Sequence, residues 1–217
     1  MMKKPERVDI FRDVGEAVSA LSEFGKSFVM PCVEQSAGEI AHRSARGAWI
    51  KPLGQRRSGA VQLFARWAGD NVPRMIKSAH YVINQEQFDR LVRRTGRDLL
   101  GAWRDLSTDR SARLSLGVAY RVVDLLFMAI NESEACRSGS IQGFLHIPLD
   151  GSTLRPLRFC VDELLDRDFA IDIPAVVPTG FVATEEQYIL LQEAIFALAA
   201  RADVPPITYA YFCGESC

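Results

Sequence analysis

The sequence predicts a mainly α-helical protein, a compact multi-helix domain with a helical N-terminal extension and few short extended segments. Apolar residues recur three and four positions apart in several segments, and helix-capping residues precede some of them. The chain has 217 residues, of which 48% are hydrophobic and 24% charged. That length is enough to bury a core without metal or disulfide bonds. No apolar run reaches the ~18 residues of a membrane span and no secretion signal opens the chain, so we expect a cytoplasmic protein without membrane association.

Helical spacing defines the N-terminal elements. Phe11, Val14, Val18 and Leu21 lie three or four residues apart, which predicts a helix that ends near Gly25. A second helix is expected from about Val33 to Arg46, then a loop from Gly47 to Gly59 and a short helix around residues 61–67.

Two further helices and a buried core helix are expected in the middle of the chain. Asn84 is a suitable N-cap for a helix, and Gly96 is expected to separate that helix from another, antiparallel one. The most apolar run, Leu114 to Ile130, is too long for an ordinary strand and predicts a buried helix. This helix should be the core of the fold.

The C-terminal part carries two helix-start signals. Asp150-Gly-Ser-Thr153 is typical of a helix entrance, and Thr184-Glu-Glu-Gln187 is a capping box that should open a helix to about Ala200. After Pro205 and Pro206 we expect a short extended segment, Ile207 to Phe212. We expect either an N-terminal extension (1–58) followed by a core domain (59–217), or one continuous domain.

Charge is distributed unevenly along the chain, although the net charge is only −1. Residues 41–80 hold eight basic groups and one acidic group, whereas residues 122–217 hold five basic and 14 acidic groups. Guanidinium groups bind phosphate oxygens in a forked geometry and indole rings stack on bases, so the basic block suits a nucleic acid. Alternatively, it lies against the acidic block within the monomer. The candidate nucleic-acid contacts in the basic block are Arg43, Arg46, Lys51, Arg56, Arg57, Arg66 and Trp49.

The sequence indicates no metal or cofactor. Five widely spaced cysteines without a secretion signal are expected to be reduced thiols, and only Cys213 and Cys217 are close together. The chain lacks the Gly-Lys-Ser/Thr phosphate loop, the Rossmann glycine pattern and the Gly-x-Ser-x-Gly elbow, which disfavours three common classes of enzyme. A site assembled from distant residues, such as Asp150, His146 and a cysteine, is left open.

One motif resembles a known family. Leu114-Ser-Leu-Gly117-Val-Ala119-Tyr-Arg121 places a glycine-led turn before the long apolar helix, and Asp150 follows Ile-Pro-Leu about 30 residues later. This arrangement resembles the helix-hairpin-helix DNA glycosylase superfamily, of which 8-oxoguanine DNA glycosylase is one branch, over about residues 84–165. The resemblance implies that Gly117 and Arg121 contact DNA and that Asp150 is the catalytic carboxylate.

The motif departs from the family pattern at two positions. Ala119 replaces the second hairpin glycine, and Arg121 occupies the position of the lysine that attacks the sugar in bifunctional members. Because a guanidinium stays protonated, Schiff-base lyase activity is not expected. Structural roles compete with the functional ones, since Asp150 could cap a helix and Arg121 could pair with Asp124 or a C-terminal carboxylate.

Two function classes follow from these patterns. One is a nucleic-acid-associated helical protein that resembles a DNA glycosylase, with or without catalysis, and whose partner is DNA. The other is a non-enzymatic interaction module, such as an inhibitor, immunity factor or adaptor. Its opposite charge blocks would engage a protein partner or a second copy of the chain.

Overall fold

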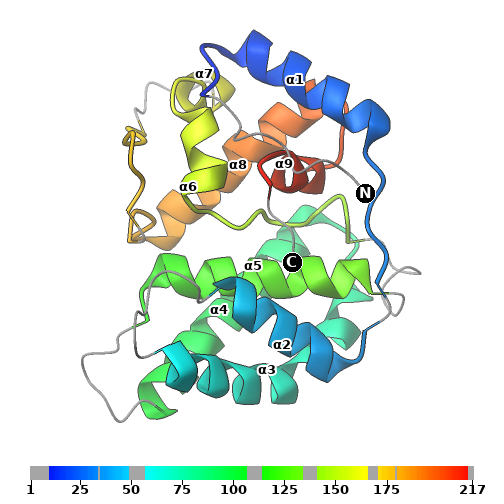
Figure 1. Ribbon diagram of the computed structural model, residues 1–217, viewed down its shortest axis with the longest axis vertical. Helices are drawn as coiled ribbons and strands as arrows, with labels where there is room; N and C mark the ends of the chain where they lie inside the picture. The colour runs from blue at the N-terminus through cyan, green and yellow to red at the C-terminus, as the bar shows by residue number, and fades with distance from the viewer. Residues whose placement is uncertain are drawn as a thin grey trace. The chain divides into compact units, whose positions relative to one another are not determined.

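The protein is all-helical in the part of the chain that the structure describes. The computed structural model describes residues 10–33, 35–48, 57–106, 114–133, 141–165, 171–178 and 180–214, with the side chains of 45–48, 57–61 and 105–106 left out. Every regular element in these ranges is a helix (Figure 1), which confirms the predicted fold class. None of the helices within these ranges is long and apolar enough to span a bilayer.

Contacts divide the chain into two compact units. The terminal unit consists of Met1–Val29 and His146–Ser216, and the central unit consists of Met30–Leu145 together with Cys217. The chain therefore enters and leaves the central unit once, near Val29 and near His146. The expected division between residues 58 and 59 falls within one helix, α3 (Arg57–Ala79).

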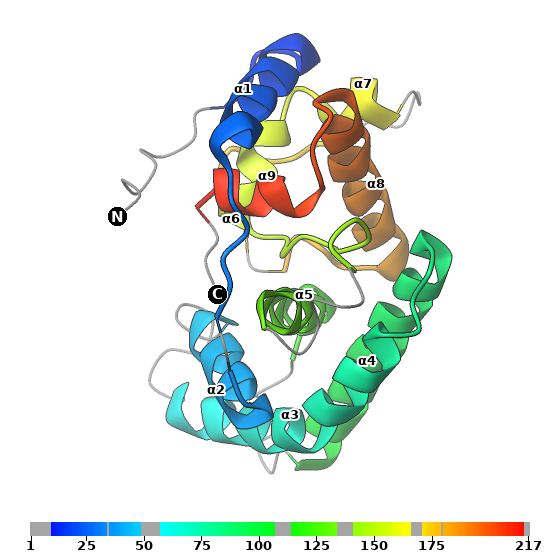
Figure 2. The ribbon, with the colours of Figure 1, turned by 90° about the vertical axis from the view of Figure 1, so that its right-hand side faces the viewer.

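The central unit is built around α5 (Leu116–Glu132), of which 14 of 17 residues are buried. The Ser115 side chain caps this helix by accepting a hydrogen bond from the Val118 amide at 3.4 Å. A mainly apolar helix that is buried on every face must be surrounded by other elements to be stable in water. Figure 2, which looks along α5, shows the neighbouring helices α2 (Ala37–Ala48), α3 and α4 (Gln85–Leu106) around it. The predicted buried helix is confirmed.

The prediction that Gly96 ends a helix is wrong, because α4 runs unbroken through it. A Cβ atom on Gly96 would lie 2.9 Å from Cε2 of Tyr120, a fully buried residue of α5. The glycine therefore allows α4 and α5 to approach closely. Asn84 does cap α4 as expected, since its Oδ1 accepts the Gln87 amide at 3.0 Å.

The short helix expected around residues 61–67 is also longer than predicted. It continues as α3 through Pro73 to Ala79, although an interior proline removes a backbone hydrogen bond and costs about 3 kcal/mol. Trp67, Val72 and Met75 are buried along this helix. Their burial, at about 1.5–3 kcal/mol for each large side chain, offsets that cost.

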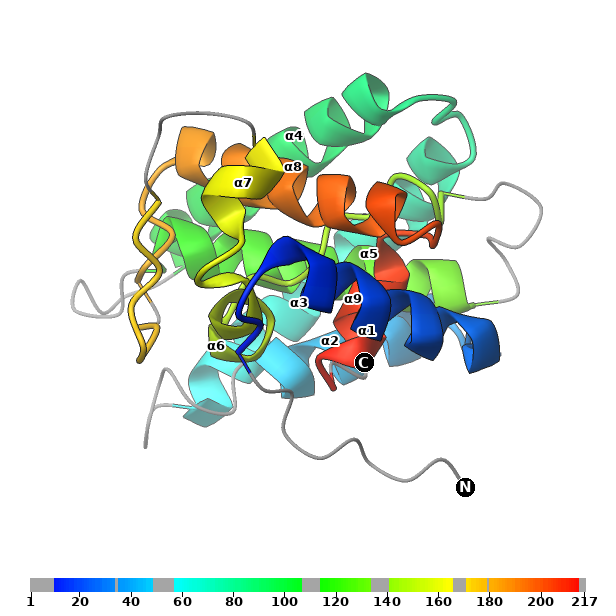
Figure 3. The ribbon, with the colours of Figure 1, turned by 90° about the horizontal axis from the view of Figure 1, so that it is seen from above.

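The terminal unit contains the first helix and all those after residue 150. Figure 3 shows α1 and α9 crossing, with α8 beside them. The capping box predicted for α8 is present in a shifted form, because Thr184 Oγ1 accepts the Gln187 amide while Gln187 Oε1 accepts the Ala183 amide. The helices of this unit are α1 (Val14–Ser27), α6 (Gly151–Leu154), the 3-10 turn η3 (Arg155–Leu157), α7 (Val161–Leu165), α8 (Glu185–Arg201) and α9 (Ile207–Phe212).

The extended segment expected at Ile207–Phe212 is instead helix α9. Pro206 stands at its N-terminal end, where a missing N–H costs nothing because the first amides of a helix have no partner within it. Four successive residues from Ile207 to Ala210 are buried, and the Tyr209 hydroxyl donates to the Thr153 carbonyl at 2.6 Å. These contacts hold the segment as a helix within the unit.

Gly96→Ala should destabilise the protein, whereas Gly101→Ala in the same helix should stabilise it. Both changes gain about 1 kcal/mol of helix propensity. At Gly96 the added methyl meets the buried Tyr120 ring, an overpacking that costs about 1–3 kcal/mol, while at Gly101 no described atom beyond its chain neighbours and its own helix backbone lies within 4 Å of the added Cβ. Urea denaturation measures both. Equal stabilisation by the two substitutions would contradict the close approach of α4 and α5.

Candidate nucleic-acid interface

A row of arginines follows one face of α4. Arg90, Arg94, Arg97 and Arg104 are all exposed. Their spacing of four, three and seven residues places them within about 80° of one another around the helix. At 1.5 Å per residue the row is about 21 Å long. We call these four residues the arginine row.

One described carboxylate of α4, Glu86, forms an ion pair with the arginine row. Glu86 pairs with Arg90 at 2.9 Å, and both side chains are exposed. Asp89 and Asp98 lie about 90° to either side of the row's centre. Surface ion pairs such as Glu86–Arg90 contribute little free energy, so this pair does not prevent Arg90 from engaging an anion.

Helix α3 adds exposed positive charge to the same helical hairpin. The described side chains of α3, α4 and the turn between them include seven exposed basic groups and three exposed carboxylates. The hairpin surface is therefore basic. The basic residues are Arg66, Arg74, Lys77 and the arginine row, and the acidic residues are Asp70, Glu86 and Asp98.

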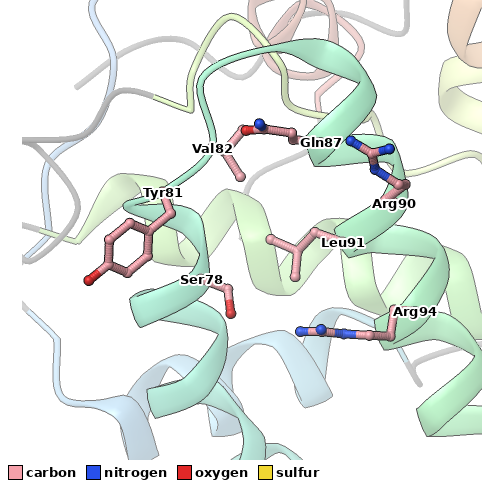
Figure 4. A pocket seen from close by; sticks show the side chains of 7 residues that line it. All are labelled: Ser78, Tyr81, Val82, Gln87, Arg90, Leu91 and Arg94. Carbon is pink, nitrogen blue, oxygen red and sulfur yellow. The ribbon is translucent and has the colours of Figure 1, made fainter.

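A pocket of about 520 Å³ opens between the end of α3 and the beginning of α4. Figure 4 shows Arg94 reaching from α4 toward Ser78 of α3, with Leu91 between Arg94 and Arg90. None of the lining residues is acidic. The lining combines two guanidiniums and three neutral polar groups with two apolar side chains, and consists of Ser78, Tyr81, Val82, Gln87, Arg90, Leu91 and Arg94.

Of the contacts predicted in the basic block, Arg66 is exposed, whereas Arg43 is engaged inside the central unit. Arg43 Nη2 lies 2.8 Å from Glu132 Oε2, and the Glu132 side chain is only 1% exposed. Arg43 also donates from Nη1 to Gln35 Oε1 at 3.2 Å. Arg43 therefore neutralises a buried carboxylate of α5, which is a structural role.

The remaining predicted contacts of the basic block are only partly described. The backbone of Arg46 and Arg57 is helical, but their side chains lie outside the described part. Trp49, Lys51 and Arg56 lie wholly outside the described residues. Two aromatic residues of the same block, Phe64 and Trp67, are buried with ring centroids 5.8 Å apart. These two rings belong to the core and offer no stacking surface.

The residues carried over from the glycosylase resemblance fall in both units. Gly117 is buried in the first turn of α5, and Arg121 is half-buried on the same helix of the central unit. Asp150 belongs to the terminal unit, where it caps α6 in a capping box. Its Oδ1 accepts the amides of Ser152 and Thr153 at 2.7 and 3.4 Å, and its own amide donates to Thr153 Oγ1 at 3.0 Å. The helix entrance predicted at Asp150 is thus present.

Two of the groups considered for a site built from distant residues, His146 and Cys160, are buried. His146 is 1% exposed, and its Nδ1 lies 2.8 Å from the Tyr188 hydroxyl. Burial, together with the nearby carboxylates of Asp13, Glu163 and Glu16, raises the pKa of the Cys160 thiol to about 11. A buried thiol with this pKa remains protonated near neutral pH and is a poor nucleophile. Among the described residues no cluster of metal ligands is present.

Sequence reasoning missed the arginine row, although its signal was present. Residues 81–121 hold eight basic and five acidic groups, so their net charge does not reveal the pattern. Sorting the predicted helix that begins at Asn84 by helical face would have separated the arginines from Asp89 and Asp98.

The comparisons give no relative from which to transfer a function. The chain matches no family model, no curated protein and no solved structure.

Arg43→Gln should destabilise the protein by about 3 kcal/mol, because it removes the cation that lies 2.8 Å from the buried Glu132 carboxylate. The double variant Arg43→Gln, Glu132→Gln should recover most of this loss, since no buried charge remains to be neutralised. Urea denaturation of the two single variants and the double variant measures the coupling. Additive effects would show that the pair is not coupled.

Proposed function

We propose that this protein is a nucleic-acid-associated helical protein that binds DNA through the hairpin of α3 and α4. The arginine row is the observation that carries this proposal. Its length of about 21 Å corresponds to about six base pairs of duplex, at 3.4 Å each, so several arginines meet phosphates of one backbone at once. Arginine is suited to this task because its planar guanidinium binds phosphate oxygens in pairs.

The exposed charge favours the central unit as the binding surface. Among the described residues of the terminal unit, the exposed basic residues are Arg12, Lys26 and Arg201, whereas eight carboxylates are exposed. A polyanion is attracted to the hairpin and repelled by the terminal unit. The eight exposed carboxylates are Asp13, Glu23, Asp162, Glu163, Asp172, Glu186, Glu193 and Asp203.

The arginine row is tested by measuring duplex binding against salt concentration. Replacing Arg94, Arg97 and Arg104 by Gln should lower the affinity about 10- to 100-fold at low salt. The slope of log K against log salt should also fall in magnitude by about 2.7, since each phosphate contact contributes about 0.9. Fluorescence anisotropy with a labelled 20-base-pair duplex gives both quantities.

The matched control removes the same charge from the terminal unit, by replacing Arg12, Lys26 and Arg201 with Gln. This variant should keep the wild-type salt slope, because the three residues lie outside the hairpin. If the wild-type protein shows no affinity at low ionic strength, DNA binding is refuted. Such a result, with a mass that rises with protein concentration, would favour the interaction-module alternative.

Base excision at Asp150 is a second candidate function, because the half-buried carboxylate follows Ile-Pro-Leu at a helix start, as the glycosylase resemblance implies. A carboxylate there would stabilise the positive sugar formed as the glycosidic bond breaks. Asp150→Asn is informative because asparagine caps a helix about as well as aspartate but lacks the charge.

Asp150→Asn should abolish release of 8-oxoguanine from a modified duplex while leaving the urea midpoint almost unchanged. Asp150→Ala should abolish release and also destabilise the protein by about 1 kcal/mol, because the cap is lost. Released base is measured by chromatography. Release that survives in Asp150→Asn, or no release by the wild-type protein, would leave Asp150 with its capping role alone.

A further inference from the structure

The pocket at the α3–α4 hairpin carries a positive charge that its own lining does not balance. It is lined by Arg90 and Arg94 and by no carboxylate. Arg90 donates from Nη1 to Glu86, but a guanidinium has five N–H donors, so this hydrogen bond does not use all of them. Within the described residues Arg94 makes no ion pair. The pocket therefore has the chemistry of an anion site.

The rest of the lining restricts which anion fits. Leu91 and Val82 form apolar wall, while Ser78 and Gln87 offer neutral hydrogen-bonding groups. Tyr81 is 73% exposed and Ile83 is 75% exposed, so apolar surface is open to solvent at the hairpin turn. An exposed tyrosine ring can stack on a nucleobase. A volume of about 520 Å³ lies within the usual range for small-molecule sites. The complementary ligand combines an anionic group with a flat ring.

We propose that this pocket binds a nucleotide bearing a phosphomonoester, with its phosphate at Arg94 and Ser78 and its base against Tyr81. The proposal rests on the proposed DNA-binding function and assigns the phosphorylated end of a strand as the ligand. A phosphomonoester carries about −1.5 to −2 charges near neutral pH, against −1 for an internal phosphodiester, and is therefore attracted more strongly to the Arg94 guanidinium. A terminal nucleotide also enters a pocket without the unstacking that an internal one requires.

The test compares labelled 12-nucleotide strands that carry a 5′-phosphate, a 3′-phosphate or no terminal phosphate. The wild-type protein should bind one of the phosphorylated strands about tenfold more tightly than the unphosphorylated strand. If a free nucleotide is sufficient as the ligand, unlabelled thymidine monophosphate should displace the labelled strand. If the ligand is the end of a strand, thymidine monophosphate should not displace it.

Arg94→Gln and Arg97→Gln form a matched pair, because both residues lie in the arginine row but only Arg94 lines the pocket. Arg94→Gln should remove the preference for a terminal phosphate. Tyr81→Ala should weaken the binding of every strand and of thymidine monophosphate, because the stacking of the base is lost. Arg97→Gln should weaken all strands equally and keep the preference. Circular dichroism and the urea midpoint verify that each variant is folded.

The outcomes separate this inference from the proposed function. If strands bind with no preference for a terminal phosphate, or if Arg94→Gln keeps the preference, the pocket proposal is wrong while DNA binding stands. If neither the strands nor the 20-base-pair duplex binds but thymidine monophosphate does, the DNA-binding function fails and the pocket is a mononucleotide site. If neither DNA nor thymidine monophosphate binds, both proposals are overturned.

Discussion

The burial of α5 is the constraint on which the central unit depends. A helix with 14 of 17 residues buried has no face left for water, so α2, α3 and α4 must each supply an apolar surface to it. The same demand fixes details of the neighbours. Gly96 lets α4 approach the Tyr120 ring, Phe88 meets Phe127 with ring centroids 5.1 Å apart, and Arg43 neutralises the buried Glu132 carboxylate. Packing against α5 therefore also determines which side of α4 remains outside.

The arginine row is a consequence of that packing. Because Phe88, Val92, Thr95 and Leu99 are buried, residues at the complementary positions of α4 face solvent, and these are mainly arginines. The row is held on a helix rather than on a loop, so the backbone positions of its arginines keep a fixed spacing. A fixed spacing favours simultaneous contact with several phosphates, since less backbone freedom is lost on binding.

In the terminal unit, buried polar side chains form hydrogen bonds with backbone groups of the segment around α6. The Gln192 side chain forms two hydrogen bonds with the backbone of Ile147, at 2.9 and 2.8 Å, and Tyr209 donates to the carbonyl of Thr153. These bonds fix the irregular segment 146–150 that leads to the α6 cap. Asp150 thus has a defined position whether or not its carboxylate takes part in chemistry, which is why a substitution that keeps the cap is needed to distinguish the two roles.

The sequence by itself determined the helical class, the buried helix after Ser115, and the starts of α4, α6 and α8, because capping and hydrophobic periodicity are local properties. Tertiary structure decided the continuity of α4 through Gly96, of α3 through Pro73, and the helical state of Ile207–Phe212, because contacts distant in sequence outweighed local propensity there. Tertiary structure also decided which arginines form buried ion pairs and which are exposed. Arg43 and Arg94 are the same residue type, yet one neutralises a buried carboxylate and the other borders an open pocket. Only the packing of the helices distinguishes them, since no local pattern records which carboxylate a long side chain will meet.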